Sequence, residues 1–406
     1  MKLVTPSYYK MFRCTAGACR DNCCRGGWLV GIDEQTEERY RKMPGALGQK
    51  LRAALFKQGG ETFLKHADED CPMLEADGLC AVVKEAGPEA LGVVCDQFPR
   101  FSEYFGERKE TGVGLACEEA ARIVLTSAPE EARLTESGLA EEPYEDDEYE
   151  KTWDDRVRCV RAVFDGMLEH ADISGGFNRL FEALQAMLLS AADLQMDANK
   201  NDFAAFDRKA QTLAADGGEC AIRALAGRLR PCVTNAAASR NQAYIGLFTD
   251  LESIGKAWDE ELSRLRSVYG TEPFVSHFPQ RAAGFEAEHE DLSHALARYA
   301  RYLHFRYFGK AVYDHDILGK CKQTALFTLM LEMMLMADWK DENGPKTQAE
   351  PGQIPESLAA SVHLFSRQVE YDEENMEQIA EDLTFERCVR TDELICALSH
   401  YTKQIG

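Results

Sequence analysis

The sequence lacks an uninterrupted apolar run that is long enough to cross a membrane. Its most apolar segment, residues 317–336, is interrupted by Lys320, Lys322 and Glu332, whereas a bilayer span needs about 20 apolar residues in succession. The chain also reaches Pro6 and further charge before an apolar stretch of signal-peptide length can develop. We therefore expect a cytoplasmic protein with no membrane partner, in which residues 317–336 form a buried helix.

Positive charge is scarce as well. The chain has 46 Lys and Arg against 69 Asp and Glu, which gives a formal net charge of −23. Such a field repels a phosphate backbone, so we expect no nucleic-acid partner. The same field would attract a lysine-rich protein surface, although an acidic surface also serves plain solubility.

Several catalytic motifs are missing. Glycine pairs such as Gly26-Gly27 and Gly175-Gly176 do not build the Gly-x-Gly-x-x-Gly turn of a Rossmann-type methyltransferase or dehydrogenase. The chain has no Gly-x-x-x-x-Gly-Lys-Ser/Thr loop, no Gly-x-Ser-x-Gly elbow and no His-Glu-x-x-His sequence. These absences disfavour phosphate-driven, serine-hydrolase and zinc-protease chemistry.

Cysteine, in contrast, is abundant at the amino-terminal end. Eight of the fourteen cysteines fall within the first 117 residues: Cys14, Cys19, Cys23, Cys24, Cys71, Cys80, Cys95 and Cys117. Clustered thiols in a reducing compartment are typical of metal ligands, so we predict that these eight bind metal. The remaining six are scattered singly through helical patterns and are predicted to be small buried hydrophobes: Cys159, Cys220, Cys232, Cys321, Cys388 and Cys396.

Thiolate ligands select zinc or an iron–sulfur cluster over magnesium or calcium. Zinc sites commonly use paired Cys-x-x-Cys knuckles, which this cysteine series lacks. Four residues separate Cys14 from Cys19, three separate Cys19 from Cys23, and a proline follows Cys71, which favours cluster ligation and leaves zinc as the alternative. The adjacent Cys23 and Cys24 should point in different directions in any regular backbone.

Two breaks in composition divide the chain: an acidic run at residues 141–150 and a polar stretch at residues 340–355. We place the main boundary near residue 140, between a cysteine-rich metal-cluster domain (residues 1–140) and a helical domain (residues 141–406). Beyond it, apolar residues recur with helical spacing over residues 157–168, 177–189, 243–265 and 292–308. The fold class expected is mainly α, with an irregular amino-terminal domain that holds a few short strands, for example at Trp28–Ile32 and Val93–Val94, followed by a helical array.

The ordered cysteine series carries a family resemblance. It reads Cys-Thr-Ala-Gly-Ala-Cys-Arg-Asp-Asn-Cys-Cys, then Cys-Pro-Met-Leu with Gly-Leu-Cys, then Cys-Asp-Gln-Phe-Pro-Arg, then Leu-Ala-Cys-Glu-Glu-Ala-Ala-Arg. This series resembles the flagellin lysine-N-methylases, which belong to a wider group of zinc- or iron-chelating cysteine-cluster proteins. The likeness is specific over residues 8–122 and weaker around residues 301–308 and 316–319.

The resemblance implies an S-adenosylmethionine-dependent methyltransferase that modifies lysines of flagellin and holds a 4Fe-4S cluster with its amino-terminal cysteines. Radical enzymes that use S-adenosylmethionine with a 4Fe-4S cluster typically carry a Cys-x-x-x-Cys-x-x-Cys run. In this chain Cys24 follows Cys23 directly, so that pattern fails. Arg100 and Arg122 are candidates for binding the cofactor carboxylate, because a guanidinium offers two parallel donors, or else they form ordinary salt bridges. An iron–sulfur redox protein and a zinc-organised binding module stay open as alternatives, as does the oligomeric state.

Methyl transfer would require a neutral lysine nitrogen and a surface that tolerates a sulfonium. Aromatic faces can provide such a surface, and the candidates near the cysteines are Tyr8, Tyr9, Phe98, Phe101, Tyr104 and Phe105, each of which also suits a simple core. A basic and aromatic helix at residues 298–308, with Arg298, Arg301 and Arg306, could face the cofactor or pair with surplus carboxylates.

Overall fold

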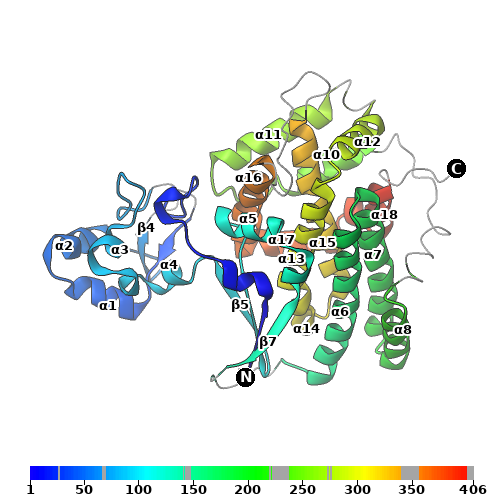
Figure 1. The fold of residues 1–406 in the computed structure, drawn as a ribbon, viewed down its shortest axis with the longest axis horizontal. Coiled ribbons are helices and arrows are strands. Elements are labelled where there is room, and N and C mark those ends of the chain that lie inside the picture. The colour runs from blue at the N-terminus through cyan, green and yellow to red at the C-terminus, as the bar shows by residue number, and fades with distance from the viewer. Residues whose placement is uncertain are drawn as a thin grey trace.

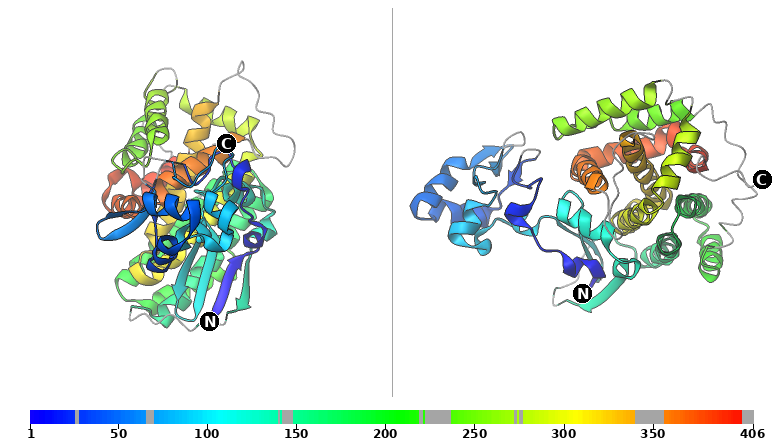
Figure 2. Two further views of the ribbon diagram at one scale, coloured as in Figure 1. Left: turned by 90° about the vertical axis from the view of Figure 1, so that its left-hand side faces the viewer. Right: turned by 45° about the horizontal axis from the view of Figure 1, so that its top comes forward.

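The computed structural model of this chain describes residues 1–25, 28–65, 70–139, 141, 148–218, 221, 237–271, 274, 277–339 and 356–399. The fold is mainly α, which confirms the predicted class. Figure 1 shows a small lobe at one side of a larger helical body, and the right-hand view of Figure 2 shows the same separation from a second direction. Residues 142–147 of the acidic run at 141–150, and the polar stretch at 340–355, lie outside the described residues.

The strands are β1 (Lys2–Pro6), β2 (Val30–Gly31), β3 (Phe56–Gln58), β4 (Glu61–Lys65), β5 (Arg100–Phe105), β6 (Arg108–Val113) and β7 (Leu134–Gly138). The helices before residue 140 are α1 (Glu34–Lys42), α2 (Gly45–Ala54), α3 (Ala81–Ala86), α4 (Val93–Gln97) and α5 (Glu118–Thr126), with 3-10 turns η1 (Ser7–Met11), η2 (Ala16–Ala18), η3 (Pro88–Ala90) and η4 (Pro129–Ala132). All strands of the described residues therefore precede residue 140, as predicted.

The body is built from α6 (Lys151–Ser174), α7 (Phe177–Asn199), α8 (Phe203–Ala215), α10 (Ala237–Leu247), α11 (Lys256–Gly270), α12 (Phe278–Glu288), α13 (Leu292–Tyr307), α14 (Ala311–Asp314), α15 (Ile317–Asp338), α16 (Glu356–Phe365), α17 (Glu373–Phe385) and α18 (Thr391–Ser399). Short turns η6 (Phe308–Lys310) and η8 (Arg387–Val389) and a π-helical turn, η7 (Ser366–Glu370), connect them. None of the helices in these described ranges is both long and apolar enough to cross a membrane.

A four-stranded sheet in the order β5-β6-β1-β7 lies beside the helical body. Strand β1 pairs in parallel with β6 and antiparallel with β7. The chain runs from β1 through η1 into the lobe and comes back to the body through β5. Both connections of the lobe therefore start from one sheet.

The lobe has a second, three-stranded sheet in the order β2-β4-β3, covered by short helices. The Asp33 side chain caps α1 by accepting from the Thr36 N–H at 2.9 Å, an arrangement that stabilises a helix start. The strand predicted at Trp28–Ile32 is confirmed by β2, but the one at Val93–Val94 is wrong. Both valines begin α4 instead, where the N–H of Val93 donates to the Asp33 side chain at 3.4 Å, so tertiary context prevails over β-branched propensity.

Two apolar clusters divide the molecule. One belongs to the lobe and is built around Tyr40, Leu51 and Met73, which are almost fully buried. The other joins the helices to the first and last parts of the amino-terminal region, for example through Tyr8 and Val113. The second cluster contains residues from both sides of residue 140. Whether the chain has two independently folding units that meet near residue 140 stays a prediction.

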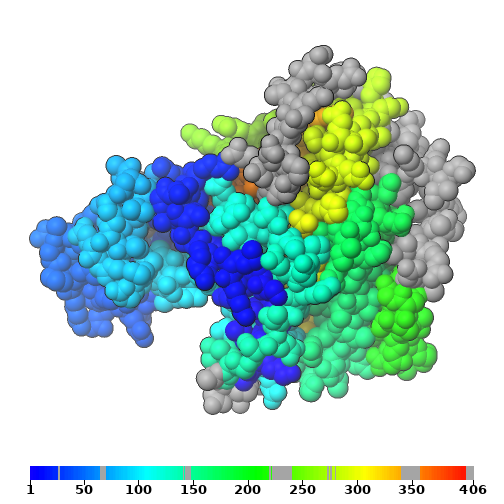
Figure 3. Space-filling model, in the orientation of Figure 1, coloured from blue at the N-terminus to red at the C-terminus, as the bar shows by residue number. Residues whose placement is uncertain are grey.

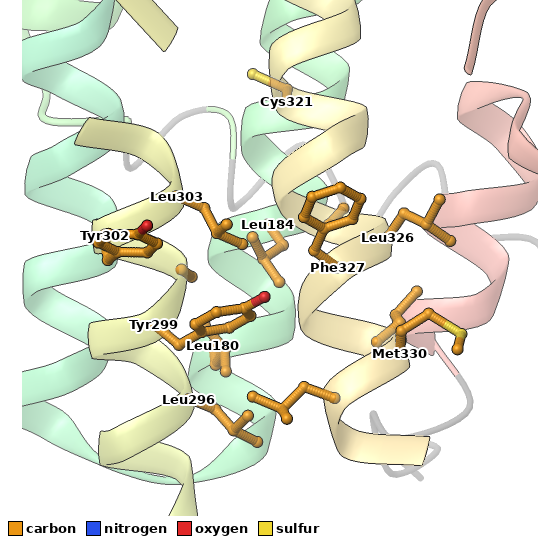
Figure 4. Close-up of a cluster of buried hydrophobic side chains, with 14 of the residues drawn as sticks. Leu180, Leu184, Leu296, Tyr299, Tyr302, Leu303, Cys321, Leu326, Phe327 and Met330 are labelled. Carbon is orange, nitrogen blue, oxygen red and sulfur yellow. The ribbon is translucent and has the colours of Figure 1, made fainter. Parts of the chain in front are cut away.

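Helix α15 forms the centre of the body. Sixteen of its 22 residues are buried, as expected for a largely apolar helix in a core. Its hydroxyl groups are satisfied locally, because Thr324 and Thr328 donate to the carbonyls four residues before them at 3.0 and 2.7 Å. Figure 4 shows Phe327 of α15 on the side of Leu184 and Leu303, whereas Leu326 and Met330 lie on the opposite side of the helix. Side chains thus surround α15, and the prediction of a buried helix here is confirmed.

A buried network of charges joins the sheet to helix α6. Arg108 on β6 donates two hydrogen bonds of 2.8 Å to Asp154 and one of 2.9 Å to Glu110. Arg161 on α6 donates to the same Glu110 at 2.7 Å and also to the carbonyl of Phe305 on α13. Removal of one partner from such a network leaves an uncompensated buried charge, so these contacts hold the sheet in place.

His304 on α13 is buried in the same region, with 1% of its surface exposed. Its Nε2 lies 3.0 Å from the carbonyl of Arg161, and a carbonyl only accepts, so Nε2 carries the ring proton. Burial, followed by the nearby Arg161 guanidinium, lowers the pKa of His304 to about 4. The ring is therefore neutral in the folded state at neutral pH.

We predict that His304 makes the fold sensitive to acid. Its pKa is lower in the folded chain than in the unfolded chain. The free energy of unfolding should therefore fall by about 3 kcal/mol as the pH falls from about 6.5 toward 4. The His304→Gln variant retains a side-chain N–H for the Arg161 carbonyl and removes this titration. Urea unfolding at pH 7 and pH 4.5 should show a smaller loss for this variant than for the unaltered chain. The exposed His170→Gln is the control, and equal losses in all three proteins would contradict the prediction.

Candidate cysteine site

The structure brings most of the predicted metal ligands to the side of the lobe that faces the body. Cys19, Cys23 and Cys24 lie in the loop that follows η2. Cys80 and Cys117 stand at the first turns of α3 and α5 as their N-cap residues. The set is completed by Cys71, which is buried, and Cys95, which lies within α4.

Five of these thiols form one electrostatic group. Burial, and then the neighbouring Cys71, Cys23 and Cys80, raise the pKa of the Cys95 thiol to about 12. A hydrogen bond with Cys24 lowers the pKa of Cys23, and bonds with Cys23 and Cys71 raise the pKa of Cys24. The adjacent thiols of Cys23 and Cys24 thus lie close together, unlike the prediction, because a turn replaces the regular backbone that was assumed.

Two more cysteines border this group. Burial, and then Glu118 and Cys23, raise the pKa of the Cys19 thiol to about 11. Burial raises the pKa of Cys117 to about 12, although the N–H groups at the start of α5 partly offset the effect. Cys14 is exposed, and its sulfur accepts from the Ala16 N–H at 3.4 Å. Its role as a metal ligand stays a prediction, and we call the other seven cysteines the cysteine site.

The cysteine site suits a soft metal by its chemistry. Burial and the nearby thiols raise the pKa of most of these thiols, so forming a thiolate costs free energy. A bound metal cation would offset that cost, because thiolate is the form that binds metal. N–H groups of Val83 and Val82 also act on Cys80, where they offset part of the rise in thiol pKa that burial causes. Among the described residues, however, no three His, Cys, Asp or Glu side chains are spaced as ligands of one metal ion. The predicted metal centre therefore stays a prediction.

Charged contacts at Asp21 and at Arg20 attach the cysteine loop to the body. Asp21 lies 2.7 Å from Nε2 of His363 on α16 and accepts from Arg367 at 2.9 Å. A hydrogen bond with His363 is the main reason that the pKa of Asp21 falls to about 2. Nearby, Arg20 donates to Glu118 at the start of α5 at 2.7 Å. The loop is therefore held at two points by charged contacts.

Three aromatic rings lie beside the cysteine site. Trp28 and Phe98 of the lobe and Tyr371 of the body have ring centroids 5.3 to 5.6 Å apart. The Arg367 guanidinium lies 4.4 Å from the Trp28 ring centroid, which is a cation–π contact. Burial raises the pKa of Tyr371, and Cys23 is among the charges that act on it, so this aromatic group closes one side of the site.

The π-helical turn η7 contributes one side chain to the contact with the lobe and another to the core of the body. Arg367 extends toward the lobe, whereas Glu370, one turn later, is buried under α13. The Glu370 carboxylate accepts from Tyr302 at 3.0 Å and from Tyr307 at 2.8 Å, and Arg306 donates to the Tyr302 hydroxyl at 2.6 Å. Single π-helical turns occur frequently at functional sites.

The predicted cofactor-binding arginines lie on the surface. Arg122 forms a salt bridge with Glu119 on its own helix, which is the alternative considered from the sequence. Arg100 donates to the Asp96 carbonyl at 3.3 Å and lies over the ring of Phe12. Their role in binding a cofactor stays a prediction.

All three arginines of the basic helix pair with carboxylates, which is the second of the two alternatives predicted for it. Arg298 and Arg301 of α13 bond to Asp172 and Asp165 on α6. Arg306 approaches Glu370 at 3.6 Å and lies over the ring of Phe101. Arg306 is thus the member of this helix that points toward the cysteine site, since it also acts on the pKa of Tyr371.

The cysteines outside the site vary in exposure. Cys321 is buried in the core of the body, as predicted and as Figure 4 shows. Cys159 is exposed, so that prediction is wrong there, because its position on α6 faces away from the helix stripe. Cys388 and Cys396 are half-buried, and Cys220 and Cys232 lie outside the described residues.

The sequence analysis did not identify Asp21, His363, Arg367 or Tyr371. The one available signal was the four-residue spacing of His363 and Arg367 in an otherwise apolar segment, which places both on one helix face. Nothing in the sequence ties that face to Asp21, more than 340 positions earlier.

Comparison with known proteins gives relatives with related names. The chain is 30% identical over 154 residues to the lysine-N-methylase of Salmonella typhimurium and equally to that of Salmonella choleraesuis. These matches cover 36% of this chain and 38% of each relative, so the chain spans well under half the length of these methylases. It is also 32% identical over 135 residues to the flagellar biosynthetic protein FliU of Salmonella muenchen, which covers 31% of this chain and 79% of that protein. No protein-family model and no solved structure matches the chain.

We predict that Asp21 and Arg367 are energetically coupled. Arg367→Leu removes an ion pair and a cation–π contact, so the free energy of unfolding should fall by about 2 kcal/mol. A double-mutant cycle with Asp21→Asn, measured by urea unfolding, should give a coupling of about 1 kcal/mol. The matched control is the exposed pair Arg390 and Asp392, 3.1 Å apart, whose coupling should be close to zero. A coupling no larger than that of the control would contradict the prediction.

Proposed function

This chain belongs to the family of the lysine-N-methylases and FliU, and from that premise we propose that it is a cytoplasmic protein-lysine N-methyltransferase acting on flagellin. It uses S-adenosylmethionine as methyl donor and carries an iron–sulfur cluster in the cysteine site. The finding that carries the proposal is the gathering of seven cysteines from five separate segments against the helical body. A scattered set of structural cysteines would not converge in this way.

The reaction is an in-line displacement. The lone pair of a neutral lysine nitrogen forms the new bond to the methyl carbon as the carbon–sulfur bond breaks, and that bonding pair stays on sulfur, which leaves a neutral thioether. The methylated nitrogen then releases its surplus proton to solvent or to a base. Free lysine has a pKa near 10.4, so the site must favour the neutral amine by desolvation or proton removal.

The residues of this chain would contribute binding and orientation. The half-buried faces of Trp28 and Phe98 and the partly exposed Tyr371 suit a sulfonium or a lysine stem, which aromatic faces attract. A net charge of −23 favours the approach of a lysine-bearing protein. Cys19, Cys23, Cys24, Cys71, Cys80, Cys95 and Cys117 would supply the ligands of the cluster. When bound, the cluster would provide a Lewis-acidic iron that anchors the amino and carboxylate groups of the methyl donor.

We predict that the chain purified without oxygen is brown and contains iron with acid-labile sulfide. Cys71→Ser and Cys95→Ser should each lose most of the iron and lower the unfolding temperature of the lobe, since metal binding and folding are coupled. Cys321→Ala and the exposed Cys159→Ser should retain it. Iron analysis and absorbance spectra measure the result. Zinc without iron would favour a zinc-organised binding module, and iron loss in the control variants alone would overturn the assignment of the site.

We further predict that the purified chain, incubated with S-adenosylmethionine and unmodified flagellin, adds methyl groups to flagellin lysine side chains without an external reductant. The neutral amine is already a nucleophile, and the cysteine spacing of radical enzymes is missing. Mass spectrometry of flagellin peptides gives the answer. An iron-containing chain that transfers no methyl group would favour the redox alternative, and a strict need for dithionite would discard the displacement step.

A further inference from the structure

A cavity lies between the four-stranded sheet and helices α6 and α13. Its volume is about 330 Å³, within the range of roughly 300 to 1,000 Å³ typical of small-molecule pockets. Residues of β1, β6 and β7 line one side, residues of α6 and α13 line the other, and η4 contributes to the border. No cysteine lines this cavity, so it is distinct from the cysteine site.

The lining is rich in positive charge, although the chain as a whole is strongly acidic. Six arginines line it: Arg108, Arg133, Arg158, Arg161, Arg298 and Arg301. Three carboxylates accompany them: Glu110, Glu136 and Asp165. Apolar side chains such as Val4, Val124 and Leu134 complete the wall. The surface thus suits a molecule that has both an apolar body and a negative group.

Four of the six arginines are largely buried and held in ion pairs. Arg108 and Arg161 share Glu110, as described above. Arg301 bonds to Asp165 at 3.2 Å, and Arg298 bonds to Asp172 at 3.1 Å. Their positions are fixed by contacts to the protein, so they form a rigid wall rather than free binding groups.

The other two arginines retain free donors at the rim. Arg133 uses its Nε to reach Glu169 at 2.7 Å. Arg158 has Asp155 as its nearest carboxylate, at 3.9 Å, and it makes no hydrogen bond to any residue that the structure describes. Their side chains are 61% and 48% exposed, respectively. Both guanidinium groups can therefore turn toward an anion that enters the cavity.

Inside the cavity, Tyr8 presents an unused polar group. Its side chain is buried, with 2% exposed, and its hydroxyl has no hydrogen-bond partner among the described residues. Burial raises the pKa of Tyr8 well above its usual value, so the group is a neutral donor. An acceptor on a ligand in the cavity would give this hydroxyl a hydrogen bond that no described residue supplies.

We propose that this cavity is a binding site for a small organic anion that bears a carboxylate or a phosphate. Arg158 and Arg133 bind the negative group at the rim, Tyr8 donates to it or to a neighbouring oxygen from inside, and the apolar wall receives the rest of the molecule. The rigid ion pairs of Arg108, Arg161 and Arg301 keep the cavity open between sheet and helices. This site is additional to the cysteine site and does not require the proposed methyl transfer.

The test is thermal unfolding of the full chain titrated with three probes: inorganic phosphate, citrate and S-adenosylmethionine, each compared with sodium chloride at equal ionic strength. We expect at least one probe to raise the Tm of the unaltered chain. Arg158→Gln and Tyr8→Phe should each weaken the apparent affinity for that probe by about tenfold, the loss of one charge-assisted or buried hydrogen bond. Their Tm values without probe should change little, because Arg158 is half exposed and phenylalanine preserves the ring of Tyr8.

The matched control is Arg179→Gln, an exposed arginine on α7 that pairs with Glu182 and does not line the cavity. It should bind the probe as the unaltered chain does. Stabilisation by phosphate but not by citrate or S-adenosylmethionine would identify a phosphate-bearing ligand, and the opposite result would identify a carboxylate. No stabilisation by any probe, or equal stabilisation of the Arg158→Gln and Arg179→Gln variants, would overturn the proposal.

Discussion

Two buried guanidinium groups, those of Arg108 and Arg161, share one carboxylate of the central sheet, and the rest of the molecule is arranged around that contact. Glu110 and Asp154 neutralise them, and all four side chains are largely withdrawn from solvent. Desolvated charges tolerate little displacement, because their attraction must offset the cost of leaving water. The sheet is therefore fixed against α6 and α13, and with it β1 and β5, through which the chain enters and leaves the lobe.

The position of the cysteine site follows from this anchoring. Six of its cysteines lie between β1 and β5, and Cys117 follows β6 directly, at the start of α5. Asp21 then sets the contact with the body through His363 and Arg367. Figure 3 shows the lobe joined to the body by a narrow region in which the first part of the chain lies across the junction.

The sequence predicted the long helices well because their signal is periodic and local. The apolar stripes at residues 157–168 and 292–308 became α6 and α13, and the apolar segment at residues 317–336 became the central helix. Short elements were less predictable. Val93 and Val94 have strong strand propensity but lie in a helix whose first N–H contacts Asp33, sixty positions earlier in the chain, so their local propensity did not decide the conformation.

The sequence by itself determined the helical class of the fold, the acidic character of the chain and the set of residues from which a metal site can be built, because composition and spacing are local properties. It also indicated the family through the order of its cysteines. The tertiary structure alone decided that Cys14 is exposed while the other seven are at least partly buried, that Asp21 meets Arg367, and that arginines from a strand and two helices line one cavity. These arrangements depend on contacts between residues far apart in the chain, and such contacts form only when the apolar faces of the helices and the sheet are buried together.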